Sequence, residues 1–138
     1  ALVDAGMTDI GPDLKGLTAE TFVRITGIGD PDLAERYRRM AWSAVEYLVR
    51  RYRDEVFVGV GIPYNPALIS KDEVAAMGER LCRLDPGLQV CVLDYRPEFR
   101  RLDLARPARS EMREIREILH GTGLKTVLCQ TASGYIGP

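Results

Sequence analysis

Two charged residues near the N-terminus are placed where they could bind a polar ligand. Asp13 and Lys15 are two positions apart, so on an extended strand their side chains point to the same side. If that side is the inside of a barrel, both charges need a partner, because burying an unpaired charge is costly. They could pair with each other, hold a ligand that carries hydroxyl, carboxylate and ammonium groups, or lie at a solvated strand end.

Arg96 is a third candidate for ligand binding. It follows an apolar run at 88–93, and an arginine at this position could clamp a carboxylate or a phosphate. The alternative is a basic surface loop in which arginines pair with nearby acids. That loop would join Arg96, Arg100 and Arg101 to Asp94, Glu98 and Asp103.

The order of the predicted elements places these candidates in one kind of fold. Three strand-like segments end in polar or proline turns and lead into helices, namely 9–15, 56–65 and 88–97. A fourth strand-like run, 124–131, closes the chain. The runs are continuously apolar, which is typical of strands covered on both faces. The alternation predicts an α/β fold with a parallel sheet, whose functional site lies at the carboxyl ends of the strands.

Capping residues and apolar spacing predict the helices. Asp30 and Pro31 can begin a long helix. Ser70 and Glu73 can form a capping box for the next helix, and Ser110 can cap the last. A short helix is expected after position 18 and should end near position 27.

The long helix is expected to bury one apolar stripe. Its members recur at spacings of three and four: Leu33, Tyr37, Met40, Ala44, Val45, Leu48 and Tyr52. The aromatic and methionine residues of this helix are therefore interpreted as packing residues and not as a cofactor site: Tyr37, Met40, Trp42 and Tyr47.

Composition indicates a soluble globular protein and narrows the classes of partner. The 138 residues are 46% hydrophobic and 28% charged, which suits a single domain spanning 1–138. A formal net charge of -1 argues against general binding to nucleic acid or anionic membranes, and no apolar run could cross a bilayer. Cys82, Cys91 and Cys129 are too widely spaced for a local metal cage. They are expected to be buried thiols in a reducing cytoplasm.

The number of predicted strands raises a problem at the edges of the sheet. Three or four parallel strands make only half of a barrel, and both edges would be open to pairing. The chain also begins at Ala1 without an initiator Met. Two hypotheses follow. The chain is a C-terminal fragment of a longer barrel, or copies of it associate through the exposed sheet edges as a homo-oligomer.

The residues around Asp13 resemble a known family. The block DIGPDLKG at 9–16, followed by TAETF at 18–22 and ITG at 25–27, is similar to the middle of radical S-adenosylmethionine (SAM) proteins of the pyruvate formate-lyase activating enzyme type. The later order of elements also matches, including a strand that ends at Ile62-Pro63 and one that ends near Arg96. The resemblance spans essentially the whole chain, but only the C-terminal half of the family's partial (β/α)6 TIM-like barrel.

The resemblance implies an oxidoreductase chemistry and a cofactor site. In the family, a four-iron four-sulfur cluster (4Fe–4S) binds SAM through its amino and carboxylate groups. Reductive cleavage then gives a 5′-deoxyadenosyl radical that abstracts hydrogen from the substrate. The Asp and Lys of this strand help to hold SAM, which carries over to Asp13 and Lys15, and Arg96 joins them as a candidate at the rim. The implied partner is a glycyl-radical protein or a small-molecule substrate.

The chain departs from the family at several positions. The CxxxCxxC loop that ligates the cluster is absent, so these residues alone should bind no cluster and be inactive. Val58 and Val60 stand in a region where activating enzymes often have an Arg, and Arg96 stands where they often have a His. These departures leave room for a related radical SAM protein of another substrate. Two alternatives stay open: a stand-alone binding or assembly module without a cluster, and an unrelated half-barrel enzyme with a phosphate-type ligand near Arg96.

Overall fold

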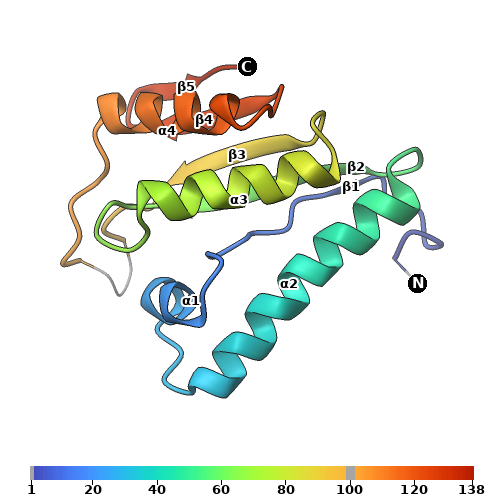
Figure 1. Cartoon of the computed structure of the whole chain (residues 1–138), viewed down its shortest axis with the longest axis horizontal. Coiled ribbons are helices and arrows are strands. Elements are labelled where there is room, and N and C mark those ends of the chain that lie inside the picture. Colours follow the sequence, from blue (N-terminus) through green and yellow to red (C-terminus); the bar gives the residue numbers. More distant parts are fainter. Residues whose placement is uncertain (1, 99–101) are drawn as a thin grey trace.

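The protein is an α/β fold, as the sequence predicts. The structure is a computed structural model, and it describes residues 2–98 and 102–138. Helices and strands alternate along most of the chain (Figure 1). The elements are β1 (Asp9–Ile10), α1 (Ala19–Thr26), α2 (Pro31–Tyr52), β2 (Phe57–Tyr64), α3 (Lys71–Leu84), β3 (Gln89–Asp94), α4 (Arg109–Gly121), β4 (Val127–Thr131) and β5 (Gly134–Ile136).

A single sheet organises the fold. Its strand order is β1-β2-β3-β4-β5, with β1 to β4 parallel and β5 antiparallel to β4. Crossovers between parallel strands are right-handed, so strands that follow the chain order place their connecting helices on one face. Burial along β3 follows this rule. Val90 and Val92 are buried towards the helices, whereas Cys91 and Leu93 on the other face are only half-buried.

The uncovered face differs from the sequence prediction. The continuous apolar runs predicted strands covered on both faces, but the helices in the described residues pack on one face only. The core lies between that face and α2, α3 and α4. It includes Val58, Val60, Ile62, Val90, Val92, Val127 and Cys129 of the sheet and Val45, Leu48, Met77, Leu81, Met112, Ile115 and Leu119 of the helices.

Local capping signals predicted where most helices begin. The Asp30 carboxylate accepts hydrogen bonds from the first amides of α2, and the Ser70 hydroxyl accepts one from the Glu73 amide at the start of α3. Gly27, with a φ of 73°, ends α1 as expected. The prediction for α4 is wrong by two residues. Its N-cap is Ala108, not Ser110.

Helix α2 buries Val45 and Leu48 of the predicted stripe, but its other buried residues lie outside that stripe. Tyr37, Met40 and Tyr47 are 45%, 56% and 59% exposed, so the interpretation of these three as packing residues is wrong. The buried residues are Ala34, Trp42, Val45, Leu48 and Val49. Apolar residues occur on both sides of this helix, so spacing alone could not select the buried side.

Trp42 explains which side of α2 faces the core. Its indole Nε1 donates a hydrogen bond to the Gly16 carbonyl at 3.0 Å, and its ring is 2% exposed. The Arg80 guanidinium carbon lies 4.3 Å from the ring centroid, in a cation–π contact. Trp42 therefore joins α2 to both α3 and the segment after β1.

Among the residues described, no strand pairs with the outer side of β1 or of β5, so the sheet has two open edges. Strand β5 was not predicted, and it covers the edge that β4 would otherwise expose. The Thr131 hydroxyl donates to the Gly134 carbonyl at 2.6 Å and closes this hairpin, with Gly134 at a φ of 101°. Within the same described residues, no helix has the length and apolar character needed to cross a bilayer.

Two methionines test the orientation of the helices. Met77 is fully buried, so Met77→Ala should lower the free energy of unfolding by about 2–5 kcal/mol through the cavity it leaves. Met40 is 56% exposed, so Met40→Ala should change that free energy by no more than about 0.5 kcal/mol. Urea denaturation followed by circular dichroism measures both. Equal losses in the two variants would contradict the observed orientation of α2.

Candidate functional site

The chain stays paired to β2 after β1 ends, and this pairing orients the first candidates. The Gly61 amide donates to the Pro12 carbonyl at 2.9 Å, and the Leu14 amide donates to the Gly61 carbonyl at 2.8 Å. Asp13 thereby forms a parallel bridge with Gly61. Leu14 points into the core and is fully buried. Asp13 and Lys15 share the opposite side, as their spacing predicts.

Asp13 and Lys15 form an ion pair with each other. The Lys15 Nζ donates to the Asp13 Oδ2 at 3.2 Å, and the side chains are 31% and 43% exposed, respectively. An accessible pair of this kind contributes only about 0.2–1 kcal/mol. A ligand that offers both an acceptor and a donor could therefore replace the two partners at little cost.

Glycine residues form the surface beneath the Asp13 carboxylate. A Cβ atom at Gly61 would lie 2.2 Å from the Asp13 Oδ1, so only glycine leaves the carboxylate in its place. With Gly11 and Gly59, this surface forms part of a hollow of about 370 Å³ on the uncovered face of the sheet. The hollow is also lined by Ile10, Phe57, Gln89, Cys91 and Leu93.

The cysteines lie on three different elements and are all free thiols. The expected burial holds for Cys129, where burial raises the pKa of the thiol to about 12. It does not hold for Cys82 and Cys91, which are half-buried. Burial, and then the nearby Asp13 carboxylate, raise the pKa of the Cys91 thiol. In the part of the chain that the structure describes, no group of three or more His, Cys, Asp or Glu side chains could hold a metal ion.

Glu73 holds the turn that follows Lys15. Its Oε1 accepts hydrogen bonds from the amides of Leu17 at 2.7 Å and Thr18 at 3.2 Å. Its Oε2 accepts one from the hydroxyl of Thr21, a fully buried residue, at 2.7 Å. The carboxylate of α3 thus organises the loop between β1 and α1, a role for which the sequence offered only a helix-capping interpretation.

Gly16 is required by the same turn. Its φ of 101° lies in the region that favours glycine. A Cβ atom there would lie 2.6 Å from the Thr21 Cγ2 and 3.0 Å from the Glu73 Oε1. In the Asp-Leu-Lys-Gly block, Leu14 and Gly16 therefore serve the fold, while the side chains of Asp13 and Lys15 reach the surface.

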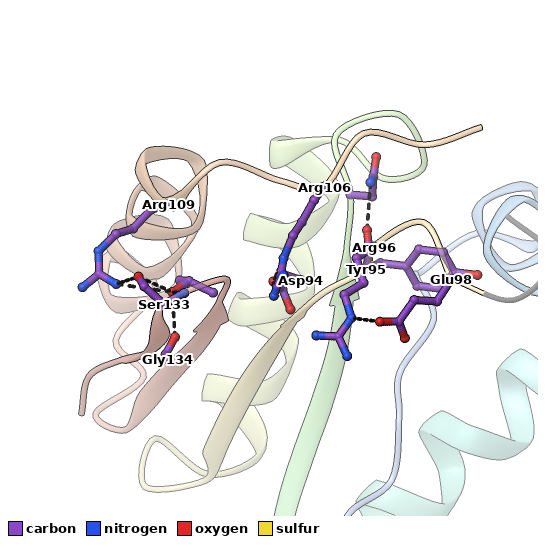
Figure 2. Close-up of polar contacts among 10 residues, drawn as sticks. Asp94, Tyr95, Arg96, Glu98, Arg106, Arg109, Ser133 and Gly134 are labelled. Carbon is purple, nitrogen blue, oxygen red and sulfur yellow. Dashed lines mark hydrogen bonds and ion pairs between the residues drawn. The ribbon is translucent and has the colours of Figure 1, made fainter. Parts of the chain in front are cut away.

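The third candidate lies in a separate place. The Arg96 Nε donates to the Glu98 Oε1 at 2.5 Å, and this ion pair raises the pKa of Arg96 (Figure 2). Asp13 pairs with Gly61, and Gly61 pairs with Cys91 on β3. Cys91 lies three residues before the end of β3, which is about 10 Å along the strand. Arg96 lies beyond that end and takes part in a loop ion pair, the alternative that the sequence left open. Its predicted neighbours at 100 and 101 lie outside the described residues.

A buried ion pair at the same rim was not predicted. The Asp94 side chain is fully buried, and its Oδ2 accepts hydrogen bonds from Arg106 Nε at 2.6 Å and Nη2 at 2.5 Å (Figure 2). The Asn65 amide nitrogen donates to the carbonyls of Tyr95 and Ala105, both at 2.9 Å. These contacts fix the segments on both sides of the loop after β3. Asp94 belongs to the acidic set named from the sequence, but its partner is a more distant arginine.

A further arginine joins the start of α4 to the hairpin at the end of the sheet. The Arg109 Nη1 donates to the Ser133 hydroxyl at 2.8 Å and to the Thr131 hydroxyl at 3.3 Å (Figure 2). These bonds stabilise the turn between β4 and β5. The hydroxyl groups of this turn therefore form hydrogen bonds within the protein.

No family model, curated protein or solved structure matches this chain. Two kinds of observation indicate a function. One is the geometry of Asp13, Lys15 and the glycine surface beside them. The other is the sequence resemblance around the same residues.

Removing the Glu73 carboxylate should loosen the turn after Lys15. Glu73→Ala leaves the Thr21 hydroxyl and two backbone amides without their acceptor, which should cost about 1–3 kcal/mol of stability. Hydrogen exchange at Leu17 and Thr18 should become faster. Glu79→Ala is the matched control, because that side chain is 61% exposed on the same helix. Unchanged exchange at both amides would contradict the anchoring role.

The reactivity of Cys91 reports on the position of the Asp13 carboxylate. Because this negative charge raises the pKa of the thiol, Asp13→Asn should shift the pH profile of Cys91 alkylation to lower pH. Iodoacetamide labelling with peptide mapping measures this profile and separates Cys91 from the other thiols. Asp54→Asn, at a side chain 94% exposed, is the control. An identical profile in all three proteins would place Asp13 away from the hollow.

Proposed function

We propose that this chain is the C-terminal, SAM-contacting part of a radical SAM enzyme that resembles glycyl-radical activating enzymes. The observation that carries the proposal is the orientation of Asp13 and Lys15, whose side chains lie on the same side of the chain. Both charged groups reach the uncovered face of the sheet at the carboxyl end of the β1 segment, beside a hollow with a glycine floor. This agrees with the role that the sequence resemblance implies for them.

The chemistry of the pair suits SAM. SAM carries an ammonium, a carboxylate and ribose hydroxyls. The Asp13 carboxylate can accept from an ammonium or a hydroxyl, and the Lys15 ammonium can donate to a carboxylate or a hydroxyl. Because their own ion pair is accessible and weak, these exchanges need no rearrangement of the core. In this proposal the two residues bind and orient SAM.

The cysteines of this chain do not fit a 4Fe–4S cluster. Cys82 lies on α3, Cys91 on the uncovered face of β3 and Cys129 in the core, with no CxxxCxxC motif among them. We therefore assign the cluster ligands to a preceding part of a longer protein. A cluster held there would supply the electron for reductive cleavage of SAM. The 138 residues alone should be inactive.

The partial (β/α)6 TIM-like barrel is part of the same proposal. Four parallel strands in chain order, with helices packed on one face, would form consecutive strands of such a barrel. The uncovered face would then be its interior, and the free side of β1 would pair with a preceding strand. Val58 and Val60 are buried towards the helices and do not reach the uncovered face. Neither can therefore take the place of the arginine often found in that region of activating enzymes.

Other parts of the proposal have different support. Arg96 is retained as a rim contact for SAM, although its present partner is Glu98. The substrate is proposed to be a glycyl-radical protein or a small molecule, and the location cytoplasmic. The substrate class is what the resemblance implies, the cytoplasmic location agrees with the free cysteines, and Arg96 has the chemistry to bind a carboxylate.

Binding of SAM to the full-length protein tests the assignment. Asp13→Ala and Lys15→Ala should each raise the Kd for SAM about tenfold, equivalent to about 1.4 kcal/mol. Isothermal titration calorimetry under anaerobic conditions measures the Kd. The thermal midpoint should stay unchanged, because both side chains are partly exposed. Unchanged affinity in both variants would remove Asp13 and Lys15 from the site.

Two glycine variants provide a matched control. In Gly61→Ala, the new Cβ would displace the Asp13 carboxylate, and affinity for SAM should fall although no charge is lost. In Gly29→Ala, at a residue outside the hollow, the new Cβ would have no neighbour within 4 Å. Affinity in that variant should stay near that of the parent. An equal fall in both variants would contradict displacement of the Asp13 carboxylate as the cause.

A further inference from the structure

Four residues of α2 form an exposed apolar stripe, called here the α2 stripe: Tyr37, Met40, Ala44 and Tyr47. The three larger side chains are 45%, 56% and 59% exposed in chain order, and Ala44 is also exposed. A shallow hollow of about 580 Å³ follows the stripe and is lined by α2 alone. In Figure 1, no other helix lies along this outer helix on the side away from α3.

The spacing of the α2 stripe is that of a helix–helix contact. Its members are separated by three, four and three residues, the a and d pattern of a heptad repeat. The stripe is about 15 Å long, or three helical turns. Such a seam accepts the side chains of a second helix packed at a small crossing angle.

The direction of the stripe indicates a partner outside the fold. At 100° per residue, its centre lies about 120° around α2 from the centre of the buried residues. Helix α3 packs against another side of α2, where Arg80 contacts Trp42 and Glu46. The α2 stripe therefore faces away from both the core and α3.

The charges beside the stripe define the partner further. Arg36, Arg39 and Arg50 lie along one side of it and are all exposed. Within residues 2–98 and 102–138, no ion pair includes Arg36 or Arg50, whereas Arg39 lies near the Glu35 carboxylate and contributes to the lowered pKa of Glu35. A helix with acidic residues along the facing side would supply negative charge opposite these arginines. Ion pairs that flank the apolar seam in this way select partners in coiled coils.

A second copy of this chain fits the stripe less well. An antiparallel pair of α2 helices would place Tyr37 opposite Tyr47 and Met40 opposite Ala44. Side chains of these sizes could pack against each other. The same alignment would place Arg36 opposite Arg50 on both copies, and like charges at these positions are repulsive. Charge therefore favours an acidic partner over an antiparallel pair of α2 helices.

We propose that the α2 stripe is the docking site of an amphipathic helix from a partner protein. That helix carries apolar residues at heptad spacing and Glu or Asp along one side. The site is independent of the proposed SAM chemistry, because none of its residues lines the hollow beside Asp13.

Two designed peptides test this site on the 138-residue chain. Both are 21-residue amphipathic helices with Leu at a and d, and they differ only in having Glu or Lys at the flanking positions. Fluorescence anisotropy should show the Glu peptide binding at least tenfold more tightly than the Lys peptide. Arg36→Glu combined with Arg50→Glu should reverse the preference. Absence of binding, or equal binding of both peptides, would overturn the proposal.

Variants and rival occupants complete the test. Met40→Glu, at the centre of the stripe, should abolish binding of the Glu peptide without changing the circular dichroism spectrum. Leu102→Glu, at a residue 73% exposed elsewhere, should leave binding unchanged. Sedimentation velocity and flotation with vesicles of phosphatidylcholine and phosphatidylserine are run on the same proteins. Self-association or vesicle binding that Met40→Glu removes would assign the stripe to a second copy or to a membrane instead.

Discussion

Right-handed crossovers between parallel strands are the constraint on which this structure depends. Because β1 to β4 follow the chain order, helices α2, α3 and α4 pack on the same face of the sheet. The opposite face is left with Gly59, Gly61 and Cys91, and the Asp13 carboxylate lies over this surface. The hollow beside Asp13 is thus a direct consequence of the strand order, and the antiparallel β5 forms the edge of the sheet beyond β4.

Within the Asp-Leu-Lys-Gly block, residues that serve the fold alternate with residues whose side chains reach the surface. Leu14 enters the core and Gly16 permits the turn that Glu73 and Trp42 hold from two helices. Asp13 and Lys15 contribute little to stability, since their ion pair is accessible. The two charged groups are therefore free to exchange their ion pair for contacts with a ligand, as the proposed function requires.

Local signals in the sequence predicted the fold class and most helix starts, because Asp30 and Ser70 act on amides within three residues of themselves. Signals that depend on distant partners were not readable. Asp94 pairs with Arg106 across a loop, and Trp42 fixes the face of α2 through Gly16. The side shared by Asp13 and Lys15 was predictable from the period of a strand, and the pairing of Arg96 with a nearby acid was one of the two alternatives that the sequence left open.

The most direct measurement is the sequence of the parent reading frame upstream of residue 1. A cluster assigned outside these 138 residues requires ligands in the strands that precede β1. The account predicts a CxxxCxxC motif there, within a βα segment long enough to complete the partial barrel. A reading frame that starts at residue 1, or an upstream segment without that motif, would contradict the radical SAM assignment. Asp13 and Lys15 would then belong to a binding or assembly module.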